Sequence, residues 1–159
     1  MRSSFAISML IVCALLALPQ HAAAQSPVIT EITPEALAAA LKVAGWKSEV
    51  AVANNQKYVK FSIMNNRFNA VADLFGCDAQ GCTLVTYGMV FIKSDKQTPA
   101  FINNLNSRVR FIRAYLLDDG RLVIQSDVDL TGGATLRHLQ EAGGNFEGAI
   151  GEFIKMINS

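Results

Sequence analysis

The sequence predicts an α+β domain in which an antiparallel sheet packs with three helices, in the order α-β-β-β-β-α-β-β-α. Three observations predict this class. Thr33-Pro34 and Thr98-Pro99 each open a helix-compatible segment, because threonine caps free amides and proline fits the first helical turn. A third segment, near the end of the chain, repeats apolar residues with the helical period. Short β-branched and aromatic runs separated by turn residues lie between the helices, as is typical of antiparallel strands.

The first 24 residues have the three-part build of a secretory signal peptide. Arg2 precedes an apolar run from Phe5 to Leu18, and Ala22-Ala23-Ala24 then offers a cleavage site. We expect cleavage after Ala24 and a periplasmic or secreted product. The run is shorter than the roughly 20 residues of a membrane-spanning helix, so no stable membrane insertion is expected after cleavage. An uncleaved anchor and a lipoprotein processed at Cys13 are the alternatives.

Removing 24 of the 159 residues leaves 135, a usual size for one compact domain. We divide the chain into a signal peptide (1–24), a short tail (25–32) and a single domain (33–159). The full chain has 14 Lys+Arg and 13 Asp+Glu, and Arg2 leaves with the signal peptide, so the mature net charge is close to zero. Nucleic acids and anionic membranes select basic surfaces, and we expect neither as a partner.

The N-terminal half is predicted to form one helix and a four-stranded meander. The helix runs from Thr33 to about Ala44, and Gly45 can adopt the left-handed conformation that ends it. Asn54-Asn55 and Asn65-Asn66 are placed at tight turns. The fourth strand has almost no polar alternation, so we expect it to be covered on both faces by helix, neighbouring sheet or another subunit. The predicted strands are Ser48 to Ala53, Tyr58 to Met64, Arg67 to Phe75 and Thr83 to Ile92.

The C-terminal half is predicted to form a helix, a hairpin and a last helix. The helix from Thr98 should stop near Ser107, with Phe101, Ile102 and Leu105 on its buried side. The last helix, about Thr135 to Ile157, contains Gly143 and Gly144, which can break it because each glycine costs about 1 kcal/mol relative to alanine. The hairpin joins Val109 to Leu117 and Arg121 to Leu130 through Asp118-Asp119-Gly120.

Several motifs together make the chain resemble the YbjN-domain family, over roughly residues 33–157. They are Cys77-x-x-x-x-Cys82, Ile102-Asn103 with Asn106, Arg110-Phe111, Arg113-Ala114-Tyr115-Leu116, Asp119-Gly120 and Gly132-Gly133. The resemblance implies the α/β fold that YbjN domains share with type III secretion chaperones, which are dimeric. Members of the family are described as sensory transduction regulators, so the resemblance implies a regulatory or chaperone-like role. The glycine-rich last helix departs from the family pattern at Gly143, Gly144, Gly148 and Gly151.

Cys77 and Cys82 are the only cysteines left after export, and they bracket a polar turn in a compartment that permits disulfides. We interpret them as a structural disulfide that staples a hairpin. A redox-active pair is an alternative, although redox motifs favour a two-residue spacer at a helix start. Half of a metal site is another, although zinc would need two more ligands and His138 is the sole mature histidine. No cofactor is expected.

No catalytic constellation is found in the sequence. A Gly-x-Ser-x-Gly elbow, a P-loop and a dinucleotide fingerprint are all missing, and His138 is interpreted as a solvated surface histidine. Asp127 and Asp129 share one strand face by the two-residue period and could bind a cation or act in acid–base chemistry. A two-residue turn at Asp119-Gly120 would instead place Asp129 opposite Arg110, as an ordinary cross-strand charge pair.

The same two-residue turn would place Arg113 on a face with Phe111, Tyr115, Ile124 and Val128. An apolar setting is costly for a guanidinium unless the group is paired or reaches solvent. Arg113, with its neighbours Arg110 and Tyr115, is therefore our candidate for a ligand or partner contact. A structural arginine satisfied by carbonyls or a carboxylate is the alternative.

We therefore predict a non-enzymatic periplasmic protein that acts by protein contacts, with an unidentified protein partner or as a homodimer through the sheet and last helix. The row Gly144, Gly148 and Gly151 indicates tight packing on the sheet or, as a second interpretation, a helix–helix contact between copies. Two other functions remain open. One is a small thiol–disulfide protein that uses Cys77 and Cys82, and the other is a small-ligand sensor with a pocket between helix and sheet near Arg113.

Overall fold

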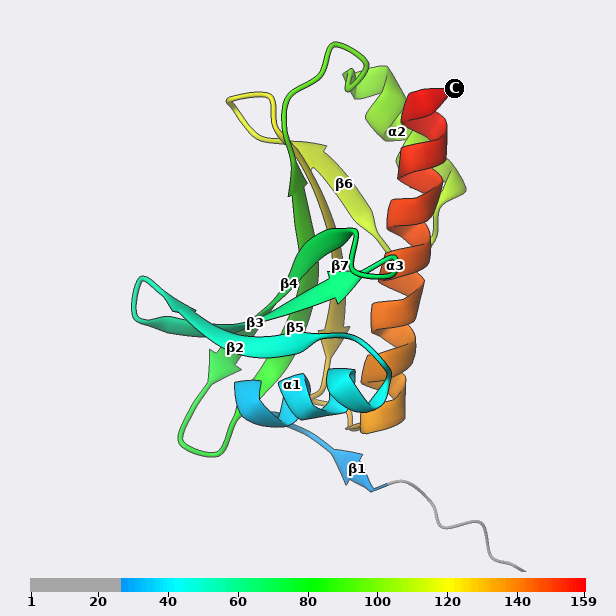
Figure 1. Ribbon diagram of the computed structural model, residues 1–159. Helices are drawn as coiled ribbons and strands as arrows, with labels where there is room; N and C mark the ends of the chain where they lie inside the picture. The colour runs from blue at the N-terminus through cyan, green and yellow to red at the C-terminus, as the bar shows by residue number, and fades with distance from the viewer. Residues whose placement is uncertain (1–26) are drawn as a thin grey trace, which may run out of the picture.

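A computed structural model describes residues 27–159 and confirms the predicted α+β class and element order (Figure 1). The helices are α1 (Pro34–Val43), α2 (Pro99–Arg108) and α3 (Leu136–Asn158). One antiparallel sheet has the strand order β2-β3-β4-β5-β7-β6, and β1 pairs with β8 in a second, two-stranded sheet. The strands are β1 (Val28–Ile29), β2 (Ser48–Ala53), β3 (Gln56–Ile63), β4 (Phe68–Cys77), β5 (Cys82–Phe91), β6 (Arg113–Leu116), β7 (Leu122–Asp129) and β8 (Ala134–Thr135).

Both predicted helix starts are confirmed. The Thr33 hydroxyl oxygen accepts a hydrogen bond from the amide of Ala36 at 3.2 Å, and the Thr98 hydroxyl oxygen accepts one from the amide of Phe101 at 3.2 Å. Each threonine is followed by a proline in the first turn. Local sequence therefore sets the first residue of each of the two short helices.

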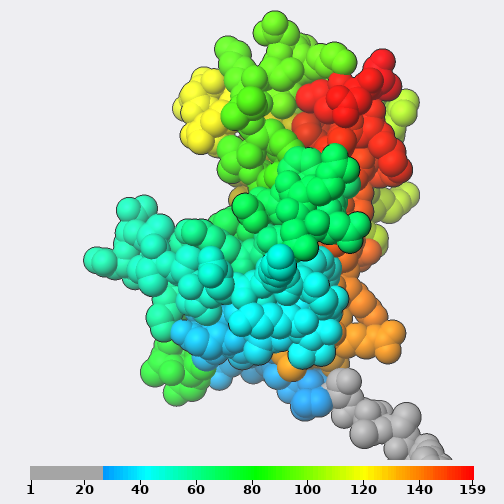
Figure 2. All heavy atoms as spheres, in the orientation of Figure 1, coloured from blue at the N-terminus to red at the C-terminus, as the bar shows by residue number. Residues whose placement is uncertain are grey.

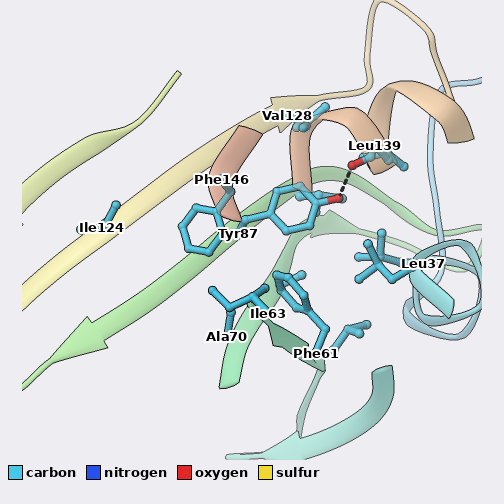
Figure 3. Close-up of a cluster of buried hydrophobic side chains, with 14 of the residues drawn as sticks. Leu37, Phe61, Ile63, Ala70, Tyr87, Ile124, Val128, Leu139 and Phe146 are labelled. Carbon is cyan, nitrogen blue, oxygen red and sulfur yellow. Dashed lines mark hydrogen bonds between the residues drawn. The ribbon is translucent and has the colours of Figure 1, made fainter. Parts of the chain in front are cut away.

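Figure 3 shows how the core holds α3 against the sheet. Tyr87 lies on the central strand β5, and its ring packs edge-on against Phe61 and stacks on Phe146 of α3. Its hydroxyl donates a hydrogen bond to the carbonyl oxygen of Leu139 at 2.8 Å. Burial of this ring raises the pKa of Tyr87 far above its ordinary value, so the group stays neutral and serves as a fixed donor.

The prediction that Gly143 and Gly144 break the last helix is wrong, because α3 is one continuous helix of 23 residues. A side chain on Gly143 would place its Cβ 3.2 Å from Cη2 of Trp46, so this glycine allows the indole to pack against the helix. The prediction that a glycine row packs tightly on the sheet is also wrong. A Cβ on any of Gly144, Gly148 and Gly151 would meet no atom within 4 Å.

The hairpin between β6 and β7 has a different register from the one that a two-residue turn predicts. Asp118, Asp119 and Gly120 form a three-residue loop that the Leu117 amide closes on the carbonyl of Arg121 at 2.8 Å. Gly120 adopts a φ of +82°, the left-handed conformation that such loops require. Arg113 therefore pairs with Gln125 in the ladder, and the one-residue shift exchanges the two faces of β7 relative to the prediction.

The N-terminal segment contributes to the fold. Residues 28–29, which fall in the predicted tail, pair with Ala134–Thr135, and Ile32 exchanges backbone hydrogen bonds with Cys82 at 3.0 Å in both directions. Residues 1–26, with the predicted signal peptide and its cleavage site, lie outside the described residues. Within residues 27–159, no helix combines the length and hydropathy needed to cross a bilayer.

Candidate protein-binding surface

All three helices pack on the same face of the six-stranded sheet. Ser48 of β2 donates a hydrogen bond to Ala38 of α1, and Tyr87 of β5 donates one to α3. The amide of Ala114 in β6 donates one to α2. The pairing of the strands places these three residues on the same side of the sheet. We call the opposite side the free face, because no described helix covers it. Its central side chains are those of Val71, Asp73, Thr86, Val90, Arg113, Tyr115, Val123, Gln125 and Asp127.

Arg113 lies on this free face and not among Ile124 and Val128, which are buried on the helix-covered side. Its Nε and Nη2 donate to Oε1 of Gln125 at 3.1 and 3.0 Å, and Nη2 lies 3.3 Å from Oδ2 of Asp127. The prediction of an apolar setting for Arg113 is wrong, because it depended on the two-residue turn. The side chain remains 62% exposed, so its guanidinium is oriented by neighbours and still accessible.

Tyr115 and Thr86 complete this polar network. The Tyr115 hydroxyl donates to Oε1 of Gln125 at 3.2 Å, and the Thr86 hydroxyl donates to Oδ1 of Asp127 at 2.6 Å. Asp127 is therefore satisfied by a hydroxyl and a guanidinium. The network holds side chains of β5, β6 and β7 in one arrangement across the free face.

Arg110 and Asp129 do not form the predicted cross-strand pair. Arg110 is exposed in the segment before β6, outside the ladder. Asp129 pairs in register with Leu84, and its Oδ1 accepts hydrogen bonds from the amide and the hydroxyl of Thr131 at 2.9 and 2.7 Å. These bonds to Thr131, the amide first, lower the pKa of Asp129. Of the three predicted contact residues, the free face thus receives Arg113 and Tyr115.

Exposed apolar side chains lie on β5 and in the segment before β6. Val90 of β5 is 51% exposed, which shows that the predicted cover of this strand on both faces is incomplete in one copy of the chain. Phe111 is 74% exposed and has a φ of +64°, a conformation that costs a bulky residue roughly 1–2 kcal/mol. Sequence reasoning missed this feature, since it placed Phe111 within a regular strand.

Asp73 is a further residue of the free face that the sequence did not indicate. It lies opposite Thr86 in the ladder and lines an open pocket of about 440 Å³ together with Tyr58 and Val71. Partial burial raises the pKa of this carboxyl group. Only the register of β4 against β5, which no local pattern encodes, brings it beside the network.

Cys77 and Cys82 are joined by a disulfide at the end of the β4–β5 hairpin, with their Cα atoms 3.9 Å apart. Cys82 is buried and also bonds to Ile32 ahead of α1, so the bridge lies where the N-terminal segment meets the sheet. Asp78 closes the turn by accepting from the amides of Gln80 and Gly81 at 2.8 and 3.2 Å. Across residues 27–159, no group of three His, Cys, Asp or Glu side chains is placed to hold a metal ion.

The small-ligand alternative predicted a pocket near Arg113. A cavity of about 310 Å³ lies between α2 and β6, where Ile102, Asn103 and Tyr115 line it and Arg113 does not. His138 is exposed at the start of α3, in agreement with its interpretation as a surface residue. Arg113 thus lies exposed on the open sheet and outside this cavity.

Asn106, one of the motif residues, has a structural role. Its side-chain Oδ1 accepts from the amide of Ala114 at 2.8 Å, and its Nδ2 donates to the carbonyl of Ala114 at 3.0 Å. The carboxamide of α2 therefore occupies the position that a neighbouring strand would take at the outer edge of β6. Covering an edge strand is one of the devices by which proteins oppose pairing with another chain.

The fold and the free face define a class: a small α+β protein with one helix-covered and one exposed face of an antiparallel sheet. The family profile described as "YbjN: Putative bacterial sensory transduction regulator" matches residues 33–159, and the chain belongs to this family. Among solved structures, it is similar to the "Crystal structure of YbjN, a putative transcription regulator from E. coli", with a TM-score of 0.56 and 13% identity over 78% of this chain and 92% of that chain. No curated protein matches the sequence.

Proposed function

We propose that this chain is a non-enzymatic periplasmic protein of the YbjN type that acts through protein–protein contacts in a regulatory or chaperone-like role. The observation that carries the proposal is the free face, where Arg113, Tyr115 and Val90 are exposed around one hydrogen-bonded network. Arginine and tyrosine are enriched at protein interfaces, and exposed apolar groups with a polar surround mark contact sites.

The network suits recognition better than chemistry. Arg113 is held by Gln125 and Asp127, so a partner would meet a guanidinium whose orientation is already fixed. Such preorganisation lowers the entropy lost on binding. Asp127 accepts a hydrogen bond from Thr86 and forms an ion pair with Arg113, so its role is to orient the guanidinium. The regulatory role is supported by the description of the family, and the periplasmic location by the signal-peptide pattern of residues 1–24.

The test is affinity capture from cells that export the protein, with quantitative mass spectrometry of what it retains. Arg113→Glu reverses the charge at the centre of the free face and should reduce capture of a specific protein at least tenfold. Arg137→Glu is the matched control, because Arg137 is an exposed arginine in a single ion pair, on α3 away from the free face. Equal capture by the two variants would contradict the proposal.

The same preparation tests the compartment. Mass analysis of the exported chain should give an N-terminus at Gln25, and the protein should be released with the periplasmic fraction. An intact Met1 in the membrane fraction would contradict a periplasmic location and make residues 1–24 an anchor.

A further inference from the structure

We propose that two copies of this chain pair through β2, the strand at the open edge of the sheet, to form a two-fold dimer with one continuous sheet. This inference goes beyond the proposed function and does not depend on it. The Ser62 amide donates to the carbonyl of Lys47 at 2.8 Å, which fixes the alternation of the β2–β3 ladder. The amides and carbonyls of Ser48, Val50 and Val52 consequently point away from β3.

Nothing in the described part of the chain occupies this edge. No described backbone or side-chain group bonds to the outward amides of Val50 and Val52. Figure 2 shows the cyan atoms of this part of the chain, around the end of α1 and β2, at the surface of the molecule. Val52 is 64% exposed on this edge.

The sequence of β2 lacks the devices that protect an edge strand. It reads Ser-Glu-Val-Ala-Val-Ala, with no lysine, no proline and a single charged side chain, Glu49. Edge strands of monomeric proteins are usually shortened, bulged or charged against pairing. Glu49 lies opposite Lys60 of β3 in the ladder, so the nearest strand of the same copy places a cation beside it.

A second copy is the occupant that fits this edge. At the other edge, in β6, Asn106 bonds to the outward amide and carbonyl of Ala114. A head-to-tail contact between β2 of one copy and β6 of the next, which would continue into a filament, would have to displace Asn106 from Ala114, whereas pairing of two β2 strands displaces no described hydrogen bond. An isologous contact between two β2 strands closes on itself, as most homodimers do.

The two-fold pairing that overlaps the whole strand is centred on Val50. Val50 then faces Val50 of the second copy, Val52 faces Ser48, and Glu49 faces Ala51. No like charges lie directly opposite each other in this register. The outward backbone groups of the three residues find partners, and Val52 is covered.

The first test is the molar mass of protein purified from exporting cells, measured by light scattering after size exclusion at tens of micromolar. Wild type should have about twice the mass of one chain. Val52→Lys should give the mass of one chain with an unchanged circular dichroism spectrum, since lysine at an exposed edge opposes pairing. Val90→Lys, on the free face, is the matched control and should stay dimeric. A monomeric wild type, or a dimer that Val90→Lys and not Val52→Lys disrupts, would overturn the proposal.

Disulfide cross-linking between copies is a second test, which applies also if Val52→Lys does not fold. Facing residues in a hydrogen-bonded pair have Cα atoms about 5.5 Å apart, within disulfide range. Val50→Cys should therefore cross-link two chains through the introduced thiols under mild oxidation. Asn55→Cys, at the exposed tip of the β2–β3 turn, should not cross-link. Equal cross-linking of the two variants, or none at Val50→Cys, would count against pairing centred on Val50.

Discussion

The two edge strands of the sheet, β6 and β2, differ in what bonds to their outward backbone groups. At β6, a strand of four residues, the side chain of Asn106 bonds to both backbone groups of Ala114. At β2, a strand of six residues, the outward backbone groups of Val50 and Val52 have no described partner. At β6 the chain itself bonds to the outward groups of Ala114, whereas at β2 the outward groups of Val50 and Val52 are available to a second chain.

The difference shows that an open edge has to be judged by hydrogen bonding as well as by exposure. Asn106 lies on a helix eight residues before its partner, and it copies the donor and acceptor pattern of a strand. Asn106, a residue of the motif described above, therefore has a structural role. Function is then expected on the free face and at β2, where groups remain accessible.

Removing the Asn106 side chain from the β6 edge should have the largest effect. Asn106→Ala removes two partly buried hydrogen bonds and leaves the amide and carbonyl of Ala114 without partners, which should cost about 2–3 kcal/mol of unfolding free energy. Urea unfolding monitored by circular dichroism measures this loss. Asn103→Ala, an exposed asparagine of the same helix, should change stability by less than about 0.5 kcal/mol. Equal losses in the two variants would show that the bonds from Asn106 to Ala114 do not stabilise the β6 edge.

Removing the disulfide tests whether dimer formation through β2 depends on the Cys77–Cys82 bridge, which lies where the segment ahead of α1 meets the sheet. Replacing Cys77 and Cys82 by serine should cost about 2 kcal/mol, because a short loop is no longer constrained in the unfolded chain. The bridge lies at the β4–β5 turn and not at β2, so we expect the dimer to persist. Urea unfolding and light scattering of the double variant check both expectations. A folded double variant that is monomeric would link the bridge to the β2 edge.

The turns that hold the two edge strands should respond in opposite directions. Gly120→Ala puts a side chain at a φ of +82° in the β6–β7 loop and should cost about 1 kcal/mol. Asn54 and Asn55, with φ of 51° and 61°, form the β2–β3 turn, where Asn-Gly is the favoured pair. Asn55→Gly should therefore raise stability, by about half a kcal/mol. The midpoint of thermal unfolding measures both, and a loss in Asn55→Gly would contradict this assignment of the turn.

The free face should show a small pH effect through Asp73. Its pKa is raised by burial, so the folded state binds a proton more tightly than the unfolded state. The resulting loss of stability develops as the pH rises from the unfolded pKa, about 3.9, through the folded value, and is complete above it. Asp73→Asn should be more stable than wild type at pH 7 and equal to it below about pH 4.

Asp129→Asn should have the opposite sign. The Thr131 amide and hydroxyl lower the pKa of Asp129, so its contribution is present above the unfolded pKa and is lost as the pH falls through the folded value. Urea unfolding of the two variants across this range measures both effects. The same sign for both variants would contradict the assigned causes.

Sequence patterns predicted the elements because their signals are local. The threonine caps, the asparagine turns and the apolar period of α3 each act over a few residues, and each prediction is confirmed. The register of β6 against β7 was missed, because a loop of three residues and a turn of two are both compatible with Asp118-Asp119-Gly120. This difference of one residue in loop length determines which face of the sheet carries Arg113. Asp73, Phe111 and the two bonds of Asn106 depend on contacts between distant segments, which composition and period do not encode.

Amide hydrogen exchange, resolved by residue and followed against protein concentration, tests the contrast between the edges most directly. The amide of Ala114 should be protected at every concentration, because its partner belongs to the same chain. The amides of Val50 and Val52 should exchange rapidly in dilute protein and become protected over the concentration range in which the mass doubles. Val50 and Val52 amides that stay unprotected in the concentrated protein, or an Ala114 amide that exchanges freely, would contradict the account.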